Sequence, residues 1–356
     1  MPASEATYVP RLDTFRAIAA LSIVYHHYLG GLLPTYLQLQ MSVGIDFFFV
    51  LSGFLITGLL LGAKGRCSAI LSSFYLRRTA RIFPLYYLAL SLGLIFQIPG
   101  FWQSLPWSPF YLVNVGMIVN NSWFGFVSHF WTLAVEEQFY LLWPILLLGL
   151  GSRVWIFAVL WIVAAMGYRY IVQAEATNLF LNMTVLGTGD ELMIGSLAAL
   201  SCKEFGAVRV ERMLRPLLLI SVPALMVAML VGIVTLVPNW FRATFIPPLA
   251  ALAFVWLTVR AWRDGPDGNS WGGKILPAIG LISYGIYVWH FLLLWPCTLL
   301  EQLGYPVVPT RLLGIAVTLV VSWLSFRFFE TPLRQFGKRL ASKLEAPEPV
   351  PSTVSV

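Results

Sequence analysis

Charged residues are scarce in this sequence. Lysine, arginine, aspartate and glutamate make up 11% of its 356 residues, whereas hydrophobic residues make up 58%. A soluble domain usually carries about a quarter charged residues. The composition therefore argues against an ordinary soluble enzyme and predicts a protein with several apolar segments that cross a membrane.

Cysteine and histidine are also few. The three cysteines (Cys67, Cys202 and Cys297) show no metal-binding spacing and no evident disulfide framework, and the four histidines lack the spacing of a zinc site. We therefore expect no metal. Basic residues outnumber acidic ones and give a net charge of +7. Because they lie between apolar segments, they indicate membrane topology and we expect no nucleic-acid partner.

Apolar segments of membrane-spanning length recur along the whole chain. Ten of them lie at about residues 14–33, 43–62, 82–98, 130–149, 154–172, 184–201, 217–237, 244–262, 278–300 and 312–331. With both termini cytoplasmic, all basic residues except Arg169, Arg242 and Arg311 fall in cytoplasmic segments. We predict an all-α polytopic membrane bundle of about ten transmembrane helices with both termini cytoplasmic.

The domain organisation follows from these segments. Residues 1–340 are predicted to form one integral-membrane domain, and the proline-rich residues 341–356 a disordered cytoplasmic tail. The connection at 99–128 is long, uncharged and rich in aromatic residues, so it is predicted to fold back over the outer mouth of the bundle. Its aromatic side chains are either interfacial anchors or a sugar-stacking surface.

The first apolar segment carries two ionisable residues on one face, which are costly to place inside a membrane. Arg16 and His27 are eleven residues apart, which is about three helical turns, or roughly 16 Å along the axis. Ionisable groups inside a membrane segment face a protein-lined cavity or pathway. We therefore predict that this face of the helix lines such a cavity.

Two carboxylates also lie within apolar segments. Asp46 begins the second segment, where it either caps the helix end or orients a histidine. Glu136 lies inside the fourth segment, where it either pairs with Arg16, orients a catalytic histidine or forms a structural hydrogen bond between helices. The residues alone leave these alternatives open.

Three arginines precede the third segment, in what is predicted to be a loop. Arg77, Arg78 and Arg81 lie within about one helical turn, and Pro84 is predicted to distort the entry to the segment. Clustered guanidinium groups suit phosphate oxygens, although they could equally set topology against anionic lipid.

Polar residues also mark the last two segments. Ser283, Tyr287 and His290 share one face of the ninth, where a histidine is more often a packing partner than a catalyst. Arg327, Glu330 and Arg334 are predicted to form ion pairs at the interface.

Six motifs occur in order: Arg16, ten residues, then His27; GIDFFFVLSGFLI; RRTARIFPLYY; WTLAVEEQFYLLWP; ISYGIYVWH; and FFETP. Together they resemble the acyltransferase-3 family of integral-membrane acyltransferases, over residues 11–335. The resemblance implies acetyl transfer across the cell inner membrane, from cytoplasmic acetyl-CoA to a hydroxyl of an extracytoplasmic carbohydrate such as an O-antigen or exopolysaccharide unit. It also implies a stand-alone form without the C-terminal esterase-like domain that some members carry.

The resemblance also implies roles for individual residues. Arg16 and His27 match the essential pair of the first helix, and Glu136 matches the carboxylate of the fourth-segment motif. Three further residues match the arginine motif that holds the coenzyme; they are Arg77, Arg78 and Arg81. His26 falls outside the motif spacing.

From these roles we predict a mechanism in which His27 is the general base for the acceptor hydroxyl. Asp46 or Glu136 would fix its tautomer, and Arg16 would hold the coenzyme or a buried carboxylate because it stays protonated. A transient acyl-histidine is a variant of this mechanism. A transporter of a small metabolite or lipid-linked sugar is the alternative function, and a structural subunit is a third. The acceptor and the oligomeric state stay open, with peptidoglycan, a lipid-linked oligosaccharide and a small glycoside also possible acceptors.

Overall fold

The protein is a bundle of helices. The computed structural model describes residues 8–32, 43–175, 179–230, 239–265 and 273–345, and no strand occurs within them. The long helices are α1 (Pro10–Leu29), α3 (Val43–Gly62), α4 (Cys67–Ile95), α7 (Phe130–Leu150), α8 (Val154–Glu175), α9 (Val185–Phe205), α10 (Ala207–Leu230), α12 (Asn239–Asp264), α14 (Ser283–Gln302), α15 (Val307–Ser325) and α16 (Thr331–Glu345). The prediction of an all-α fold is confirmed for this part of the chain.

Helices cover most of the described part of each apolar segment predicted from the sequence, and the end of the segment at 217–237 lies outside the described residues. Five stretches are long and apolar enough to cross a membrane, judged by length and composition alone. They are Gly44–Gly62, Gly125–Gln173, Trp240–Asp264, Ser283–Gln302 and Val307–Leu344. The chain is therefore a membrane protein by its helices, while the number of crossings stays a prediction.

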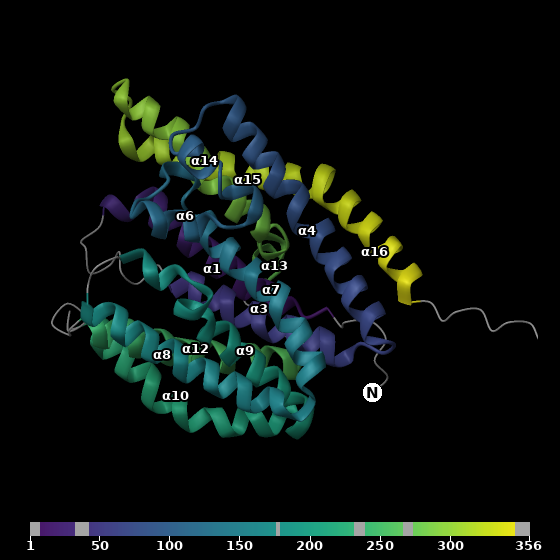
Figure 1. Ribbon diagram of the computed structural model, residues 1–356. Coiled ribbons are helices and arrows are strands. Elements are labelled where there is room, and N and C mark those ends of the chain that lie inside the picture. Colours follow the sequence, from purple (N-terminus) through teal and green to yellow (C-terminus); the bar gives the residue numbers. More distant parts are fainter. Residues whose placement is uncertain (1–7, 33–42, 176–178, 231–238, 266–272, 346–356) are drawn as a thin grey trace, which may run out of the picture.

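The tightest contact in the bundle joins α3 to α9. A Cβ atom on Gly53 would lie 1.9 Å from the backbone oxygen of Leu192, and one on Gly195 would lie 2.0 Å from that of Val50. Only glycine fits at both positions, so the two backbones approach each other directly. The helices α8, α10 and α12 pack around this pair, in the lower half of the bundle in Figure 1.

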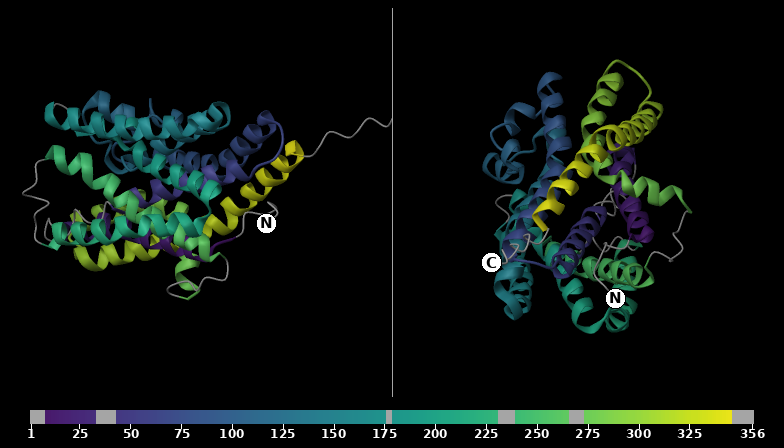
Figure 2. Two further views of the ribbon diagram at one scale, coloured as in Figure 1. Left: turned by 90° about the horizontal axis from the view of Figure 1, so that it is seen from below. Right: turned by 90° about the vertical axis from the view of Figure 1, so that its right-hand side faces the viewer.

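The other half of the bundle is built on α1. The helices α13 (Ile275–Leu281), α14 and α15 pack against it, and α4 lies beside α16 (Figures 1 and 2). The contact with α13 is close, because a Cβ atom on Gly280 would lie 1.9 Å from the backbone oxygen of Asp13. These contacts bury one face of α1 against α13 and α14, where Ala20, Val24 and Tyr28 join an apolar cluster.

The prediction of a loop before the third segment is wrong. Residues 67–95 form one continuous helix, α4, with Arg77, Arg78 and Arg81 on it and Pro84 in its interior. The first half of α4 is held by α16, where a Cβ atom on Gly337 would lie 2.3 Å from the Cβ atom of Ala80. Packing against a second amphipathic helix therefore stabilises a stretch that is too polar to be recognised as a membrane segment.

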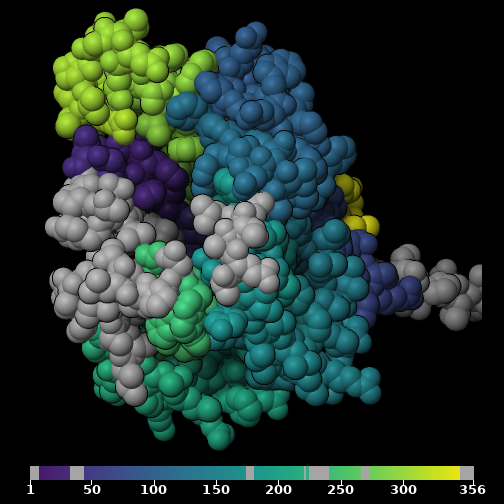
Figure 3. Space-filling view, turned by 60° about the vertical axis from the view of Figure 1, so that its left-hand side comes forward, coloured from purple at the N-terminus to yellow at the C-terminus, as the bar shows by residue number. Residues whose placement is uncertain are grey.

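The connection between α4 and α7 is folded rather than extended. It holds four short helices, which are α5 (Phe101–Ser104), η3 (Ser108–Phe110), α6 (Val113–Asn120) and η4 (Gly125–Val127). Phe101, Met117 and Phe124 are fully buried in it, whereas Trp102 and Trp123 are more than half exposed. In Figure 3 this segment, in blue, lies beside the connection between α14 and α15 on the face turned toward the viewer.

The last described helix, α16, runs to Glu345, and Ala341 is fully buried. The predicted domain boundary at residue 340 therefore falls inside this helix. Residues 346–356, the rest of the tail predicted to be disordered, lie outside the described residues.

Candidate active site

Hydrogen bonds and ion pairs fix the two ends of the bundle. Arg11 near the start of α1 pairs with Asp264 at the end of α12. At the other end of α1, Arg311 donates to the backbone oxygen of Tyr28 at 2.9 Å and to Glu301 at the end of α14 at 2.6 Å. We call the end with Arg11 and Asp264 the arginine end, because Arg16 of α1 lies toward it. We call the end with Arg311 and Glu301 the histidine end, because His27 of α1 lies toward it.

Three histidines from three helices meet at the histidine end. The Nδ1 atom of His27 on α1 lies 3.0 Å from the Nε2 atom of His290 on α14. His129 occupies the N-cap position of α7 without a side-chain capping bond. The centroid of its ring lies 5.2 Å from that of His290. His129 and His290 are buried. Tyr28 holds α14 at this level by donating to the backbone oxygen of His290 at 2.8 Å.

The hydrogen bonds decide which nitrogen of His27 is free. The Nδ1 atom of His290 lies 2.7 Å from the backbone oxygen of Tyr287, which can only accept, so Nδ1 carries the proton and donates. In a neutral ring the Nε2 atom of His290 is then an acceptor, and the Nδ1 atom of His27 donates to it. This leaves the Nε2 atom of His27 with a free lone pair, the state that a general base requires.

The partner of His27 is thus another histidine, where the sequence predicted Asp46 or Glu136. His290 was favoured as a packing residue, and its backbone does pack against Tyr28, but its ring also orients His27. His129 was not identified from the sequence as a site residue. Its position seven residues before Glu136 on the same segment was the one available signal.

His129 differs from the other two rings in its hydrogen bonds. Only 7% of its surface is exposed, and neither ring nitrogen has a hydrogen-bond partner among the described residues. The hydroxyl of Tyr287 instead donates to the backbone oxygen of His129 at 2.7 Å and accepts from Thr132 at 3.0 Å. The backbone of His129 is therefore fixed while one donor and one acceptor of its ring stay open.

Glu136 lies about two turns of α7 away from His129, toward the arginine end. It accepts a hydrogen bond of 2.7 Å from Ser52 on α3. The charges of Arg78 and Arg81 lie close enough to act on it. Glu136 therefore joins α3 to α7 between the histidines and the arginines, and its described contacts are with Ser52 and the arginine cluster rather than with His27.

The arginines gather from three helices. Arg81 lies close to the charges of Arg78 on α4, Arg16 on α1 and Arg334 on α16. Arg16 pairs with Asp13 at 2.6 Å, but neither Arg78 nor Arg81 forms an ion pair with a carboxylate of a described residue. The guanidinium group of Arg78 stacks over the ring of Tyr140, 4.9 Å from its centroid.

Arg16, Arg78 and Arg81 of this cluster were predicted as site residues. Arg334, its fourth member, was expected only to form an ion pair at the interface. Arg77 is half-buried on the same helix, one residue before Arg78. The cluster is half-buried as well. The carboxylates of Glu136 and Glu330 lie close enough to act on Arg81, but in the described ranges neither forms an ion pair with Arg78 or Arg81. These two guanidinium groups are therefore suited to bind phosphate oxygens.

Asp46 lies in a separate cluster of buried charges. Arg169 on α8 donates to both carboxylate oxygens of Asp190 on α9, at 2.6 and 2.5 Å, and the carboxylates of Asp46 and Glu191 lie close to this pair. Arg169, one of the three basic residues predicted not to fall in a cytoplasmic segment, is buried within the bundle. Asp46 therefore has a counter-charge of its own within the bundle.

No group of three or more histidine, cysteine or acidic side chains in the described ranges has the arrangement of a metal site. The chemistry available at the candidate site is that of imidazoles, carboxylates and guanidinium groups. His26 stacks edge-on against His27, with 5.2 Å between the ring centroids, and is not one of the three rings that meet.

Polar groups thus lie along the bundle from the arginine end of α1, past Glu136 and Ser52, to three histidines at its other end; we call this set of groups the polar column. The family model described as an acyltransferase domain matches residues 9–327 of the chain. The chain belongs to the acyltransferase-3 family. The matched region contains every predicted site residue and all three histidines of the cluster.

Several named proteins are similar to the chain along most of its length. It is 27% identical to the peptidoglycan O-acetyltransferase OatA of Listeria monocytogenes over 93% of the chain and 56% of that protein. It is 28% identical to "Putative peptidoglycan O-acetyltransferase YrhL" of Bacillus subtilis, over 94% of the chain and 56% of that protein. The chain therefore spans about half the length of these relatives. No solved structure matches the chain.

Proposed function

We propose that this protein is a membrane O-acyltransferase that transfers an acetyl group from cytoplasmic acetyl-CoA to a hydroxyl of an extracytoplasmic carbohydrate. The observation that carries the proposal is the Nε2 atom of His27, whose lone pair is left open by the bonding to His290. The other end of the same set of polar groups holds Arg78 and Arg81, which form no ion pair with a described carboxylate. A base at one end and a phosphate-binding group at the other are what transfer across a membrane requires.

The residues at the arginine end fit a coenzyme. Arg78 and Arg81 lack carboxylate partners in the described ranges, and guanidinium groups bind phosphate oxygens through paired hydrogen bonds. Arg16, Arg77 and Arg334 add positive charge beside them. Acetyl-CoA, when bound, supplies an acetyl group activated as a thioester.

The residues at the histidine end fit the transfer itself. The Nε2 atom of His27 accepts the proton of the acceptor hydroxyl while that oxygen bonds to the acetyl carbon, and the proton then passes to the departing sulfur. His290 keeps His27 in the tautomer this needs. His129 offers a ring N–H with no other described partner, which can donate to an oxygen atom of the substrate.

The carboxylates have supporting roles in this proposal. Glu136 accepts from Ser52 and lies near the charges of Arg78 and Arg81, so it holds α3, α4 and α7 in register along the column. Asp46 lies close to Arg169 and Asp190, and it fixes the start of α3 beside α8 and α9. Neither carboxylate needs to change protonation state for the transfer to proceed.

The proposed setting is the cell inner membrane, crossed about ten times with both termini cytoplasmic. The distribution of basic residues along the sequence supports this orientation. The acceptor is proposed to be a surface polysaccharide unit such as an O-antigen or exopolysaccharide sugar. Because OatA of Listeria monocytogenes is named a peptidoglycan O-acetyltransferase, a peptidoglycan strand is the second candidate.

The test is transfer across a vesicle wall. Purified protein is reconstituted with radiolabelled acetyl-CoA on one side only and a panel of polysaccharides and peptidoglycan fragments on the other. Label on an acceptor hydroxyl is the expected result. Passage of an unmodified solute without consumption of acetyl-CoA would contradict the proposal and favour the transporter predicted as its alternative. Comparing the O-acetyl content of surface glycans with and without the gene identifies the acceptor.

A further inference from the structure

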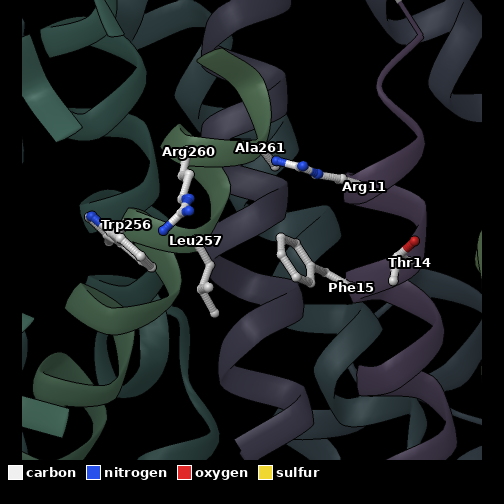
Figure 4. A pocket seen from close by; sticks show the side chains of 7 residues that line it. All are labelled: Arg11, Thr14, Phe15, Trp256, Leu257, Arg260 and Ala261. Atoms are coloured by element: carbon white, nitrogen blue, oxygen red, sulfur yellow. The ribbon is translucent and has the colours of Figure 1, made fainter. Parts of the chain in front are cut away.

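A second cationic site lies on another face of α1. A cavity of about 140 Å³ opens between the first turns of α1 and the last turns of α12. Arg11, Thr14 and Phe15 line it from α1, opposite four residues of α12. These are Trp256, Leu257, Arg260 and Ala261. Figure 4 shows Phe15 facing Leu257, with the guanidinium group of Arg11 directed toward Ala261 and that of Arg260 toward Trp256 and Leu257.

The arginines near this cavity differ in their partners. Asp264 accepts from Arg11 and also from Arg263, and Glu211 accepts from Arg263. Arg260 instead stacks over the ring of Trp256, 5.0 Å from its centroid, and forms no ion pair with a described residue. Among the described residues that line this cavity, Arg260 therefore offers a guanidinium group that no carboxylate pairs with.

The residues that line the cavity indicate its level in the membrane. Arg11 is the second residue of α1, and Arg260 lies four residues before the end of α12, so both guanidinium groups lie at helix ends. Tryptophan and arginine at the ends of membrane helices lie at the level of the lipid headgroups. Phe15 and Leu257 lie further from these ends, where the hydrocarbon chains of a lipid begin.

The geometry points to a binding site for the phosphate of an anionic membrane lipid, held by Arg260 and Arg11 with its glycerol backbone against Trp256. The size of the cavity favours a lipid over a nucleotide. Pockets that enclose small-molecule ligands measure roughly 300–1,000 Å³, whereas this one admits a headgroup whose acyl chains stay outside in the bilayer.

The lipid site is separate from the proposed coenzyme site. Arg16, the next residue after Phe15, turns to Asp13 and to the arginine cluster, while the ring of Phe15 packs edge-on against Phe47 of α3, with 5.8 Å between the centroids. The helix α1 therefore lies between the two sites, and a ligand on one does not contact the residues of the other.

The test is thermal unfolding of the full chain in a neutral detergent, titrated with phosphatidylglycerol or with phosphatidylcholine. Phosphatidylglycerol is expected to raise the unfolding temperature and phosphatidylcholine is not. In Arg260→Gln, half-maximal stabilisation is expected at a phosphatidylglycerol concentration at least fivefold higher. Arg209→Gln is the matched control, because Arg209 is also exposed and stacks over an aromatic ring, that of Phe205 at 5.6 Å.

Two results would overturn the assignment. If Arg209→Gln loses as much lipid response as Arg260→Gln, the lipid acts on surface charge in general. If acetyl-CoA or inorganic phosphate displaces the lipid effect in the wild type but not in Arg260→Gln, the cavity binds a soluble phosphate compound instead. Since Arg78 and Arg81 are intact in both variants, binding of acetyl-CoA to the proposed coenzyme site is measured independently.

Discussion

The Nδ1 atom of His27 lies 3.0 Å from the Nε2 atom of His290, and the Nδ1 atom of His290 lies 2.7 Å from the backbone oxygen of Tyr287. Two imidazoles and one carbonyl therefore form a chain in which every proton has one possible place. The carbonyl does for His290 what a carboxylate does in many catalytic triads, without adding a charge to an apolar site.

Removal of His290 should lower activity while leaving a base in place. A hydrogen bond to a group that becomes charged contributes about 1.5–3 kcal/mol, so His290→Leu is expected to lower kcat roughly 10- to 150-fold. His290→Gln should recover much of this loss, because its amide oxygen can accept from His27. The measurement is acetyl transfer in vesicles with matched protein amounts. If Gln and Leu were equally inactive, the orienting role would be wrong.

His27→Ala should cost more, on the order of 10² to 10⁴ in rate, because the base itself is lost. The control is His26→Ala on the same helix turn, which is expected to keep activity within a few-fold. Both variants are compared in the same vesicle assay after their insertion has been checked. Full transfer by a correctly inserted His27→Ala protein would rule His27 out as the base.

Arg78→Ala and Arg81→Ala should each weaken binding of acetyl-CoA about 10- to 100-fold, since each removes a charge-assisted contact to phosphate. Direct binding of acetyl-CoA to the purified variants measures this effect. Arg327→Ala is the control, because Arg327 is exposed and stacks on Phe328. If the affinity for acetyl-CoA were unchanged in Arg78→Ala and Arg81→Ala, these arginines would not bind the coenzyme, and their role would be to set the membrane topology.

The buried pair of Arg169 and Asp190 should matter for stability. Asp190→Asn leaves Arg169 without its bidentate partner and is expected to cost about 3–5 kcal/mol. Arg169→Met combined with Asp190→Leu should recover only part of this loss, because the buried carboxylates of Asp46 and Glu191 then lack the counter-charge of Arg169. Reversible unfolding in mixed micelles measures the free energy. Glu211→Gln, in the partly exposed ion pair with Arg263, is expected to cost at most about 1 kcal/mol, and an equal effect there would contradict the argument.

The contact between α3 and α9 should tolerate no added methyl group. Gly53→Ala and Gly195→Ala place a Cβ atom about 2 Å from backbone oxygen and should destabilise the protein by about 1–3 kcal/mol or more. Gly58→Ala on the same helix is the control, because no atom lies within 4 Å of its added Cβ atom. The same unfolding experiment compares all three, and equal stability would mean that the helices can separate at little cost.

The sequence predicts the helices better than it predicts their partners. The apolar segment at 43–62 coincides with α3, because length and hydropathy are local properties. The helix α4 extends well before its predicted start, because its polar half is stabilised by α16, which lies far along the chain. Local pattern cannot report such a contact.

At the site, too, features of a single helix could be predicted from the sequence, whereas contacts between helices could not. The spacing of Arg16 and His27 on one helix could be derived from the sequence, and α1 does carry both. That His290 and not Asp46 would meet His27 depends on how α14 and α3 pack around α1, which no single segment encodes. Asp46 lies close to Arg169 instead. The buried carboxylates of Asp46, Asp190 and Glu191 require a counter-charge, and another helix, α8, supplies it.

The helical run from Val307 to Glu345 is continuous, since the π-helical turn η7 (Phe326–Glu330) joins α15 to α16 without a break. At 1.5 Å per residue, a run of this length measures roughly 58 Å, about twice the thickness of a hydrocarbon core. Much of α16 must therefore stand in the aqueous layer or along the membrane surface, together with the first half of α4 that it holds (Figure 1). An anion dissolved in water can then reach Arg78 and Arg81 without passing through lipid.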